Sequence, residues 1–173
     1  MQQSAPAIRI ASAILFSALW ASTPEQSNAQ SVKQGSKVDL SRFAASGCDA
    51  SLWNRVYNPK RLQQLAPCLT VTGVITESSA DPDGDQHFLL RLDPGQDKLV
   101  NKRNRKKKDG NLVLEIVCAN PTTMKKVKSA CAGYTNPIPV PAVGTHVRAT
   151  GTYVIDSHNG WAEIHPVSRL QAM

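Results

Sequence analysis

The chain has 173 residues, with 20 Lys and Arg against 13 Asp and Glu, and a formal net charge of +7 at pH 7. This length provides one domain with a hydrophobic core. Outside the N-terminal region no stretch is apolar enough to cross a bilayer, which argues against a multispanning membrane protein. The positive charge favours polyanionic partners such as nucleic acid, anionic lipid headgroups or cell-wall polymers.

Residues 1–29 are typical of a cleavable signal peptide. Arg9 is the single charged residue before an apolar run from Ile10 to Ala21, which only Ser12 and Ser17 interrupt. These twelve residues suit a signal-peptide core, whereas a membrane span needs about 20 residues. Small residues in Ser27-Asn28-Ala29 predict cleavage before Gln30.

Two alternatives for this region stay open, namely a cut after Ala21 and an uncleaved anchor. We expect a bacterial protein that is secreted or periplasmic and has no transmembrane anchor. Arg9 and Glu25 cancel, so the predicted mature chain of about 144 residues keeps the whole net charge of +7.

Four cysteines lie in the predicted mature part, at Cys48, Cys68, Cys118 and Cys131. In an oxidising compartment an even number favours disulfides. Three pairings exist, and we favour the local one, Cys48–Cys68 with Cys118–Cys131. A zinc site is the alternative, but the usual Cys-x2-4-Cys spacing is absent.

Residues 30–47 are polar and rich in Ser, Gly and Lys, so we expect a flexible leader before a single domain over residues 48–173. Two short N-terminal helices are predicted. The first covers 49–57, with Leu52, Trp53 and Val56 on one side. The second starts at Asn58-Pro59, places Leu62 and Leu65 on one face, and ends at Pro67.

Alternation of apolar residues then predicts five strands. They cover residues 69–75, 88–92, 112–118, 147–155 and 161–167. Gly73 and Gly151 lie inside two of them and indicate bends. A short helix over 122–132 and a Pro-rich stretch separate the third strand from the fourth. We therefore expect a mainly β domain, a five-stranded OB-like Greek-key barrel, with a split sandwich as the alternative.

Residues 102–108 carry six positive charges in seven positions. Such density can neutralise phosphates and predicts binding that weakens steeply with salt. The alternative is a solvated loop without a partner. Outward positions of the second and third strands carry His87, Leu89, Arg91, Val113, Glu115 and Val117, which do not form an aromatic stacking platform. The candidate binding residues are Lys102, Arg103, Arg105, Lys106, Lys107, Lys108 and Trp161.

Acidic and imidazole side chains gather near the ends of three predicted strands. In an OB barrel the loops after strands one and four lie at the same end, so these residues would converge. Together they could hold a divalent metal or act as general acid and base. The candidates are Asp83, Asp85, His87, Asp156, His158, Glu163 and His165. The alternative is an ordinary turn and cross-strand ion pairs, because Asp81-Pro82-Asp83-Gly84-Asp85 departs from the EF-hand loop.

Four segments together resemble a group of small exported bacterial proteins of OB-like type. They are 59–62, 67–73, 83–87 and the run Gly160-Trp161-Ala162-Glu163-Ile164-His165-Pro166-Val167. The resemblance spans residues 53–170 and implies the OB-like architecture and bacterial export, but no activity. The group has His-Gly-Trp in this motif, whereas here Asn159 separates His158 from Gly160.

The sequence supports two main hypotheses. The first is a non-enzymatic binding module that engages a polyanion, such as nucleic acid or an anionic envelope polymer, through residues 102–108 and the barrel surface. The second is a metal-dependent hydrolase, for example a nuclease, that uses the Asp and His residues with a divalent metal as cofactor. A third is docking to an envelope protein. The sequence has no Gly-x-Ser-x-Gly and no phosphate-cradling glycine loop.

Overall fold

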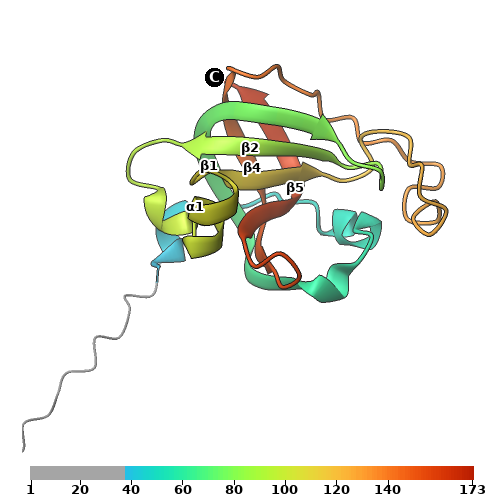
Figure 1. Cartoon of the computed structure of the whole chain (residues 1–173), viewed down its shortest axis with the longest axis horizontal. Coiled ribbons are helices and arrows are strands. Elements are labelled where there is room, and N and C mark those ends of the chain that lie inside the picture. Colours follow the sequence, from blue (N-terminus) through green and yellow to red (C-terminus); the bar gives the residue numbers. More distant parts are fainter. Residues whose placement is uncertain (1–37) are drawn as a thin grey trace, which may run out of the picture. The chain divides into compact units, whose positions relative to one another are not determined.

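The computed structural model describes residues 38–173 (Figure 1). The predicted signal peptide and the first part of the predicted leader lie outside these residues. Within 38–173 no helix has the length and apolar character needed to cross a membrane. Residues 38–47, from the predicted leader, contain the 3-10 helix η1 (Leu40–Phe43), and Phe43 packs against the main core.

Five strands form the body of the molecule. They are β1 (Leu62–Ala80), β2 (Gln86–Leu92), β3 (Leu112–Ile116), β4 (His146–Asp156) and β5 (Ala162–Ala172). The sheet closes in a ring in the order β1-β2-β3-β5-β4, with β3 and β5 parallel and the other pairs antiparallel. The prediction of a mainly β, five-stranded domain is confirmed.

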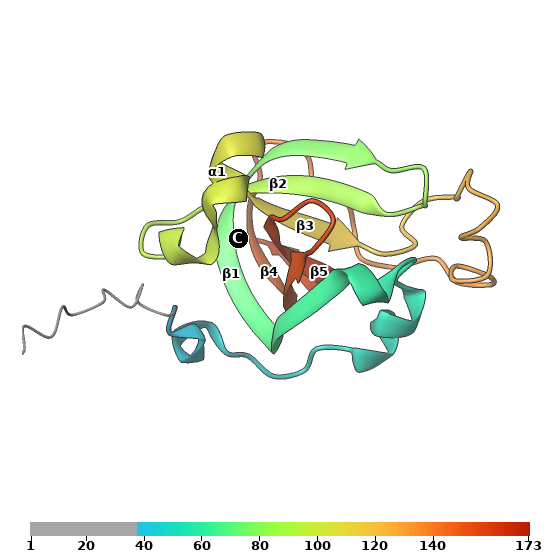
Figure 2. The same ribbon diagram turned by 60° about the horizontal axis from the view of Figure 1, so that its bottom comes forward.

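The ring closes because β1 is long enough to pair with two neighbours, β2 and β4, as it curves around the barrel (Figure 2). Two glycines allow the strands to approach closely at the bends. A Cβ atom on Gly73 would lie 2.2 Å from the carbonyl oxygen of Arg91, and one on Gly151 would lie 2.4 Å from that of Pro166. Larger residues at these positions would push the neighbouring strands apart.

The barrel interior is filled by apolar side chains that include Leu69, Ile75, Phe88 and Leu114. A smaller apolar cluster lies outside the ring, where Leu52 and Val56 pack with Leu62, Val117 and Val154. All five residues of β3 are therefore buried. Leu89, Val113, Glu115 and Val117, at the predicted outward positions, are buried as well, because both faces of the sheet are covered here.

Local structure differs from the prediction in four segments. The first predicted helix is reduced to the 3-10 helix η2 (Ala50–Arg55), and the second to η3 (Pro59–Arg61), after which β1 starts. Leu62 and Leu65 lie in β1, because pairing of this segment with β4 outweighs its weak helical pattern. Residues 122–132 form turns rather than a helix.

The fourth difference is the basic segment, for which a helix was not expected. After the 3-10 helix η4 (Asp97–Leu99), residues Lys102–Lys107 form the α-helix α1. Asn101 caps it, since its side chain accepts hydrogen bonds from the backbone N–H groups of Arg103 and Asn104. The segment is therefore an ordered element with fixed side-chain directions.

Both predicted disulfides are confirmed, Cys48–Cys68 and Cys118–Cys131. The first connects the irregular segment before η2 to β1. The second connects the end of β3 to the long loop that precedes β4. This loop lies at the opposite end of the barrel from α1 (Figure 1).

Candidate functional site

A buried imidazole surrounded by carboxylates forms the centre of the candidate site. His165 lies on β5, Glu163 two residues before it, Glu115 on β3, and Asp85 directly before β2. Nδ1 of His165 lies 2.9 Å from Oε2 of Glu115 and 3.2 Å from Oε1 of Glu163. Its Nε2 lies 3.8 Å from Oδ2 of Asp85. We call these four residues the His165 cluster.

Strand pairing explains why these residues meet. In the parallel β3–β5 ladder Val113 pairs with Glu163 and Leu114 with Ile164, so the next position brings Glu115 beside His165. Period two places Glu163 and His165 on one face of β5. Asp85 is held by the backbone of the neighbouring segment, because its Oδ1 accepts a hydrogen bond of 2.9 Å from the N–H of Cys118.

The cluster is closed off from solvent. Its exposed fractions are 3% for Asp85, 6% for Glu115, 0% for Glu163 and 1% for His165. Glu163 is also fixed from outside, since Nε1 of Trp161 donates to its Oε2 over 2.9 Å. Buried carboxylates are costly unless a cation or hydrogen-bond donors compensate their charge.

The electrostatics of the cluster are uneven. Burial, helped by the Asp83 carboxylate, raises the pKa of Asp85 to about 7. Burial and the Glu115 carboxylate raise the pKa of Glu163. For Glu115 burial acts in the same direction, but the charge and hydrogen bond of His165 outweigh it and lower the pKa of this carboxyl. Burial alone would lower the pKa of His165, yet Glu115 and Glu163 raise it well above its usual value.

One polar atom of the cluster has no hydrogen bond. Within residues 38–173, Nε2 of His165 is buried and finds no partner. Its distance of 3.8 Å to Asp85 is too long for one. A buried polar atom without a partner costs free energy, so its presence in an otherwise well-bonded site calls for a ligand or a specific role.

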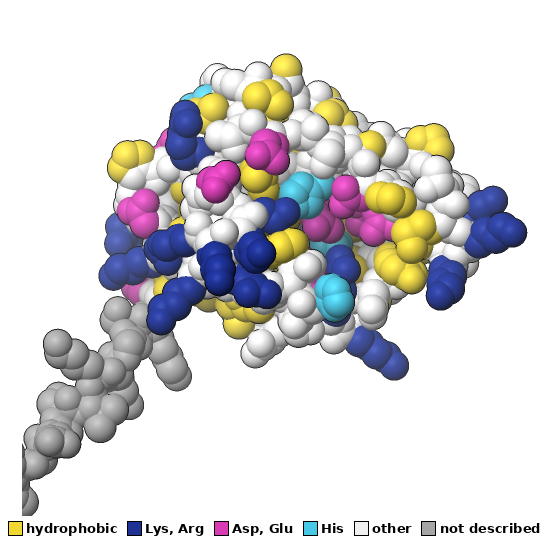
Figure 3. Space-filling model, in the orientation of Figure 1, with side chains coloured by type: hydrophobic (Ala, Val, Ile, Leu, Met, Phe, Trp, Pro, Cys, Tyr) yellow, Lys and Arg dark blue, Asp and Glu magenta, His cyan; other side chains and the backbone are white. Residues whose placement is uncertain are grey.

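A pocket of about 380 Å³ opens above the cluster, and Glu115 lines it. Figure 3 shows acidic and histidine side chains meeting in a hollow, next to a basic surface. The other charged or aromatic lining residues are Arg61, Glu77, Asp81, Asp83, His87, Lys108 and Trp161. Nζ of Lys108 lies 4.2 Å from the centre of the Trp161 ring and 3.5 Å from Nε2 of His87. Burial lowers the pKa of His87.

The helix α1 stands beside this pocket and presents positive charge. Asn104 anchors it: the side chain is fully buried, donates to the carbonyl oxygens of Asn111 and Ala162, and accepts from the N–H of Ala162. Two arginines are also tied to backbone, Arg103 to the oxygen of Asn159, and Arg105 to those of Val100 and Asp97.

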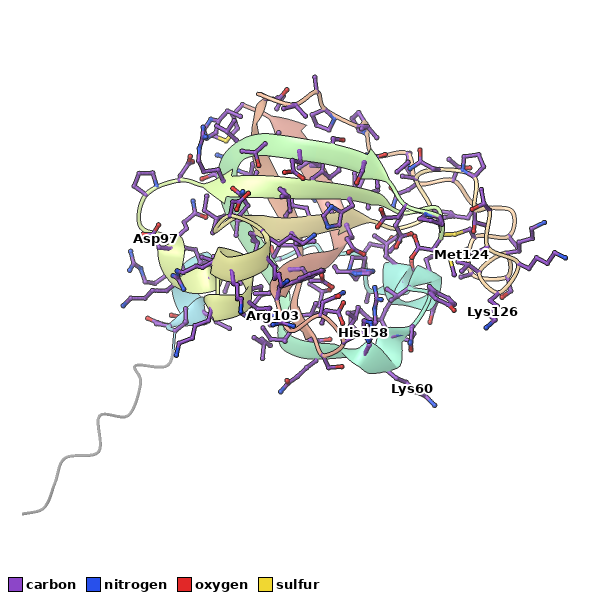
Figure 4. The ribbon with its side chains drawn as sticks, viewed as in Figure 1. Lys60, Asp97, Arg103, Met124, Lys126 and His158 are labelled. Carbon is purple, nitrogen blue, oxygen red and sulfur yellow. A yellow bond between two sulfur atoms is a disulfide. The ribbon has the colours of Figure 1, made fainter. Side chains whose placement is uncertain are left out.

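Three lysines of α1 are exposed, namely Lys102, Lys106 and Lys107. We call them the α1 basic face, and Figure 3 shows a basic surface over the region where α1 lies. Figure 4 shows Arg103 on this side of the molecule and Lys126 on the distant loop, with His158 between them.

The structure thus brings together three of the seven metal candidates, Asp85, Glu163 and His165. Asp83 and His87 line the pocket above them. Asp156 ends β4, where its charge also raises the pKa of Glu163, and His158 follows in the β4–β5 turn. There the Asp156 carboxylate accepts from the N–H of His158 and the side chain of Asn159, and lies 3.8 Å from Nε of Arg61. His158 itself is exposed.

Sequence reasoning missed Glu115 as a site residue. Its signal was present: one acidic residue in the apolar run Leu112-Val113-Leu114-Glu115-Ile116-Val117. In a strand that is buried on both faces, such a residue needs a buried partner.

No known protein family matches this chain, and no curated protein does either. The fold and site define a mainly β protein whose closed five-stranded ring carries a buried carboxylate–imidazole cluster under a charged pocket.

Proposed function

We propose that this protein is an extracytoplasmic binding module that engages a polyanion, such as nucleic acid, through the α1 basic face. One observation carries the proposal: the basic segment is an ordered helix whose anchors leave Lys102, Lys106 and Lys107 free in solvent. Lysines on an ordered helix bind phosphates or other anions at lower entropic cost than lysines on a mobile loop, because their backbone is already in place. The net charge of +7 adds long-range attraction.

The neighbouring pocket extends this surface. Lys108 follows α1 directly and lines the pocket together with Trp161. Its ammonium group lies over the indole ring, so a bound anion would meet a partly buried, positioned positive charge there. Trp161 and Lys108 therefore belong to the proposed binding surface.

Two further proposals concern class and location. The strand order β1-β2-β3-β5-β4 supports a barrel of the Greek-key OB type, in which one face commonly binds oligomers. The two disulfides support secretion or a periplasmic location in a bacterium, because disulfides persist in oxidising compartments.

A matched pair of triple variants tests the polyanion proposal. The first, K102S/K106S/K107S, removes the α1 basic face. The second, K125S/K126S/K128S, removes the same charge from three exposed lysines of the distant loop. Binding of labelled single- and double-stranded oligonucleotides is measured by fluorescence anisotropy over a range of salt concentrations.

We expect the α1 variant to bind at least about tenfold more weakly and to lower the slope of log K against log salt by about 2 to 3. The loop variant keeps most of the affinity. Equal losses of affinity in both variants would show that binding depends only on the net charge of the protein. Unchanged affinity in both would exclude the α1 basic face as the site.

A second candidate function is a metal-dependent hydrolase, for example a nuclease. The observation that favours it is the His165 cluster directly under a pocket that also holds His87 and Asp81. Incubation of the purified protein with DNA and with RNA, with Zn²⁺, Mn²⁺ or Mg²⁺ and with a chelator, tests this function. Cleavage that the chelator abolishes supports it, and no cleavage under any of these ions excludes it for nucleic acids.

A further inference from the structure

The His165 cluster has the arrangement of a metal centre. Asp85, Glu115 and His165 each offer one donor atom, and these three atoms lie within 4.8 Å of one another. Ligands about 2.1 Å from one ion are at most about 4.2 Å apart, so small side-chain movements suffice to close the set. All three side chains are buried on strands or strand ends, which holds them in place without an ion.

The hydrogen bonding of His165 indicates which ring nitrogen would bind a metal ion. Nδ1 faces two carboxylates, at 2.9 Å from Glu115 and 3.2 Å from Glu163. A metal-binding histidine typically donates this other N–H to a carboxylate, which fixes the tautomer and the ring orientation. In the neutral ring Nε2 carries the lone pair, so metal binding displaces a proton from this nitrogen. Within residues 38–173 Nε2 of His165 is the one buried ring nitrogen without a partner. It is aimed at Asp85, 3.8 Å away.

The charge balance calls for a cation at the same place. Asp85, Glu115 and Glu163 bring three carboxylates around one imidazole, all buried. Even a protonated imidazole neutralises only one of them. Arg61 and Lys108 lie at the pocket wall rather than inside the cluster. An ion of charge +2 between Nε2 and Asp85 binds the neutral ring, so its charge would offset two of the three carboxylates, and it would give Nε2 its missing partner.

We propose that Asp85, Glu115 and His165 bind one divalent transition-metal ion, Zn²⁺ or Mn²⁺, with Nε2 of His165 as the nitrogen donor. Glu163 acts as a positioning residue that accepts a hydrogen bond from Nδ1, and Trp161 holds Glu163. Glu115, whose Oε2 lies 2.9 Å from the same nitrogen, turns its carboxylate toward the ion. Imidazole with two carboxylates suits these ions, whereas Ca²⁺ takes six to eight oxygen ligands. The ion enters through the pocket that Glu115 lines.

The proposed metal site depends neither on polyanion binding nor on hydrolase activity. None of its ligands belongs to the α1 basic face, so metal binding holds even where polyanion binding fails. A structural ion without hydrolysis is also consistent with it.

Metal content is measured first on the wild-type protein. The chain is stripped with EDTA, incubated with ZnCl2 or MnCl2, passed through gel filtration and subjected to elemental analysis. We expect one ion per chain and a higher melting temperature, because an ion that binds only the folded state stabilises it. In protein labelled with ¹⁵N-histidine, the Nε2 resonance of one buried histidine moves when Zn²⁺ is added.

Three variants locate the ion. Asp85→Asn keeps the Oδ1 that accepts from Cys118, and Glu115→Gln keeps the side-chain size, so both are built to preserve the fold. His146→Gln is the matched control, since His146 forms the other close histidine–carboxylate pair described, 2.9 Å from Asp93 at the surface. We expect at least about tenfold weaker binding in D85N and E115Q and unchanged binding in H146Q.

The proposal is overturned if the wild type retains no more metal than D85N, or if H146Q loses the ion instead. An unmoved Nε2 resonance in the wild type overturns it without reference to any variant. Polyanion binding is measured in parallel on the stripped protein, so that loss of one property is distinguished from loss of the other.

Discussion

Tyr153 is a titratable side chain inside the barrel that belongs to no proposed site. It is 4% exposed, and its hydroxyl donates to the carbonyl oxygen of Leu99 over 2.7 Å. Burial raises the pKa of Tyr153 to about 12, from about 10 in an unfolded chain. A raised pKa stabilises the fold below the unfolded value, so this contribution is complete below about pH 10 and is lost as the pH rises toward 12.

The variant Tyr153→Phe isolates this group. Near pH 7 we expect it to lose about 1 to 2 kcal/mol in the free energy of unfolding, because the oxygen of Leu99 is left unpaired. Between pH 10 and 12 the difference from the wild type should shrink. Urea denaturation followed by fluorescence gives both values, and a constant difference across this range would contradict the assignment.

At the level of single residues, the sequence correctly indicated that carboxylates and imidazoles meet, but it did not identify all the residues that form the cluster. Asp85, Glu163 and His165 were expected near one another, and they lie in one cluster. Asp156 and His158 lie at the end of β4 and in the turn after it. There the Asp156 carboxylate accepts hydrogen bonds from the N–H of His158 and the side chain of Asn159. Glu115 was missed because alternation alone cannot show that both faces of β3 are covered.

Among the elements, α1 departs most from expectation, since a run of like charges predicts a solvated loop. Its stability comes from Asn104 rather than from helix propensity, which is weak over six residues. This one neutral residue between Arg103 and Arg105 lies on the buried side of the helix. The same lesson holds for residues 62–66, where pairing with β4 decides the structure.

We predict that Asn104→Ala destabilises the protein by about 3 kcal/mol, because several buried backbone groups of Asn111 and Ala162 lose their partners. Polyanion affinity should fall as well, although no charge is removed, since α1 loses its anchor. Thermal unfolding and anisotropy measure the two effects. Lys106→Ala, on the exposed side of α1, should change stability by less than about 0.5 kcal/mol.

For the whole molecule, alternation and two glycines predicted five strands in a closed barrel, with a split sandwich as the alternative, but not the strand pairing that closes the ring. Closure depends on the parallel contact between β3 and β5 and on the length of β1, which pairs on both sides. Neither property is visible in local sequence. The preference for local pairing was correct: Cys48 in an irregular segment joins Cys68 inside β1, and Cys118 after β3 joins Cys131 in the following loop.

The two disulfides are predicted to stabilise the whole molecule to similar extents. They join residues 20 and 13 positions apart, and constraint of the unfolded chain by loops of about 15 residues contributes about 3 kcal/mol. We therefore expect C48S/C68S and C118S/C131S each to lower the free energy of unfolding by about 3 kcal/mol in urea denaturation.

The two variants should differ in their effect on the His165 cluster. Cys118 donates its N–H to Asp85, so release of the 118–131 disulfide loosens a group that holds a proposed metal ligand. The 48–68 disulfide instead holds the segment before η2, whose Leu52 and Val56 belong to the outer apolar cluster. At equal loss of stability, C118S/C131S should bind Zn²⁺ more weakly than C48S/C68S. Equal Zn²⁺ affinity in the two variants would show that Asp85 is held by the sheet alone and not by the disulfide beside it.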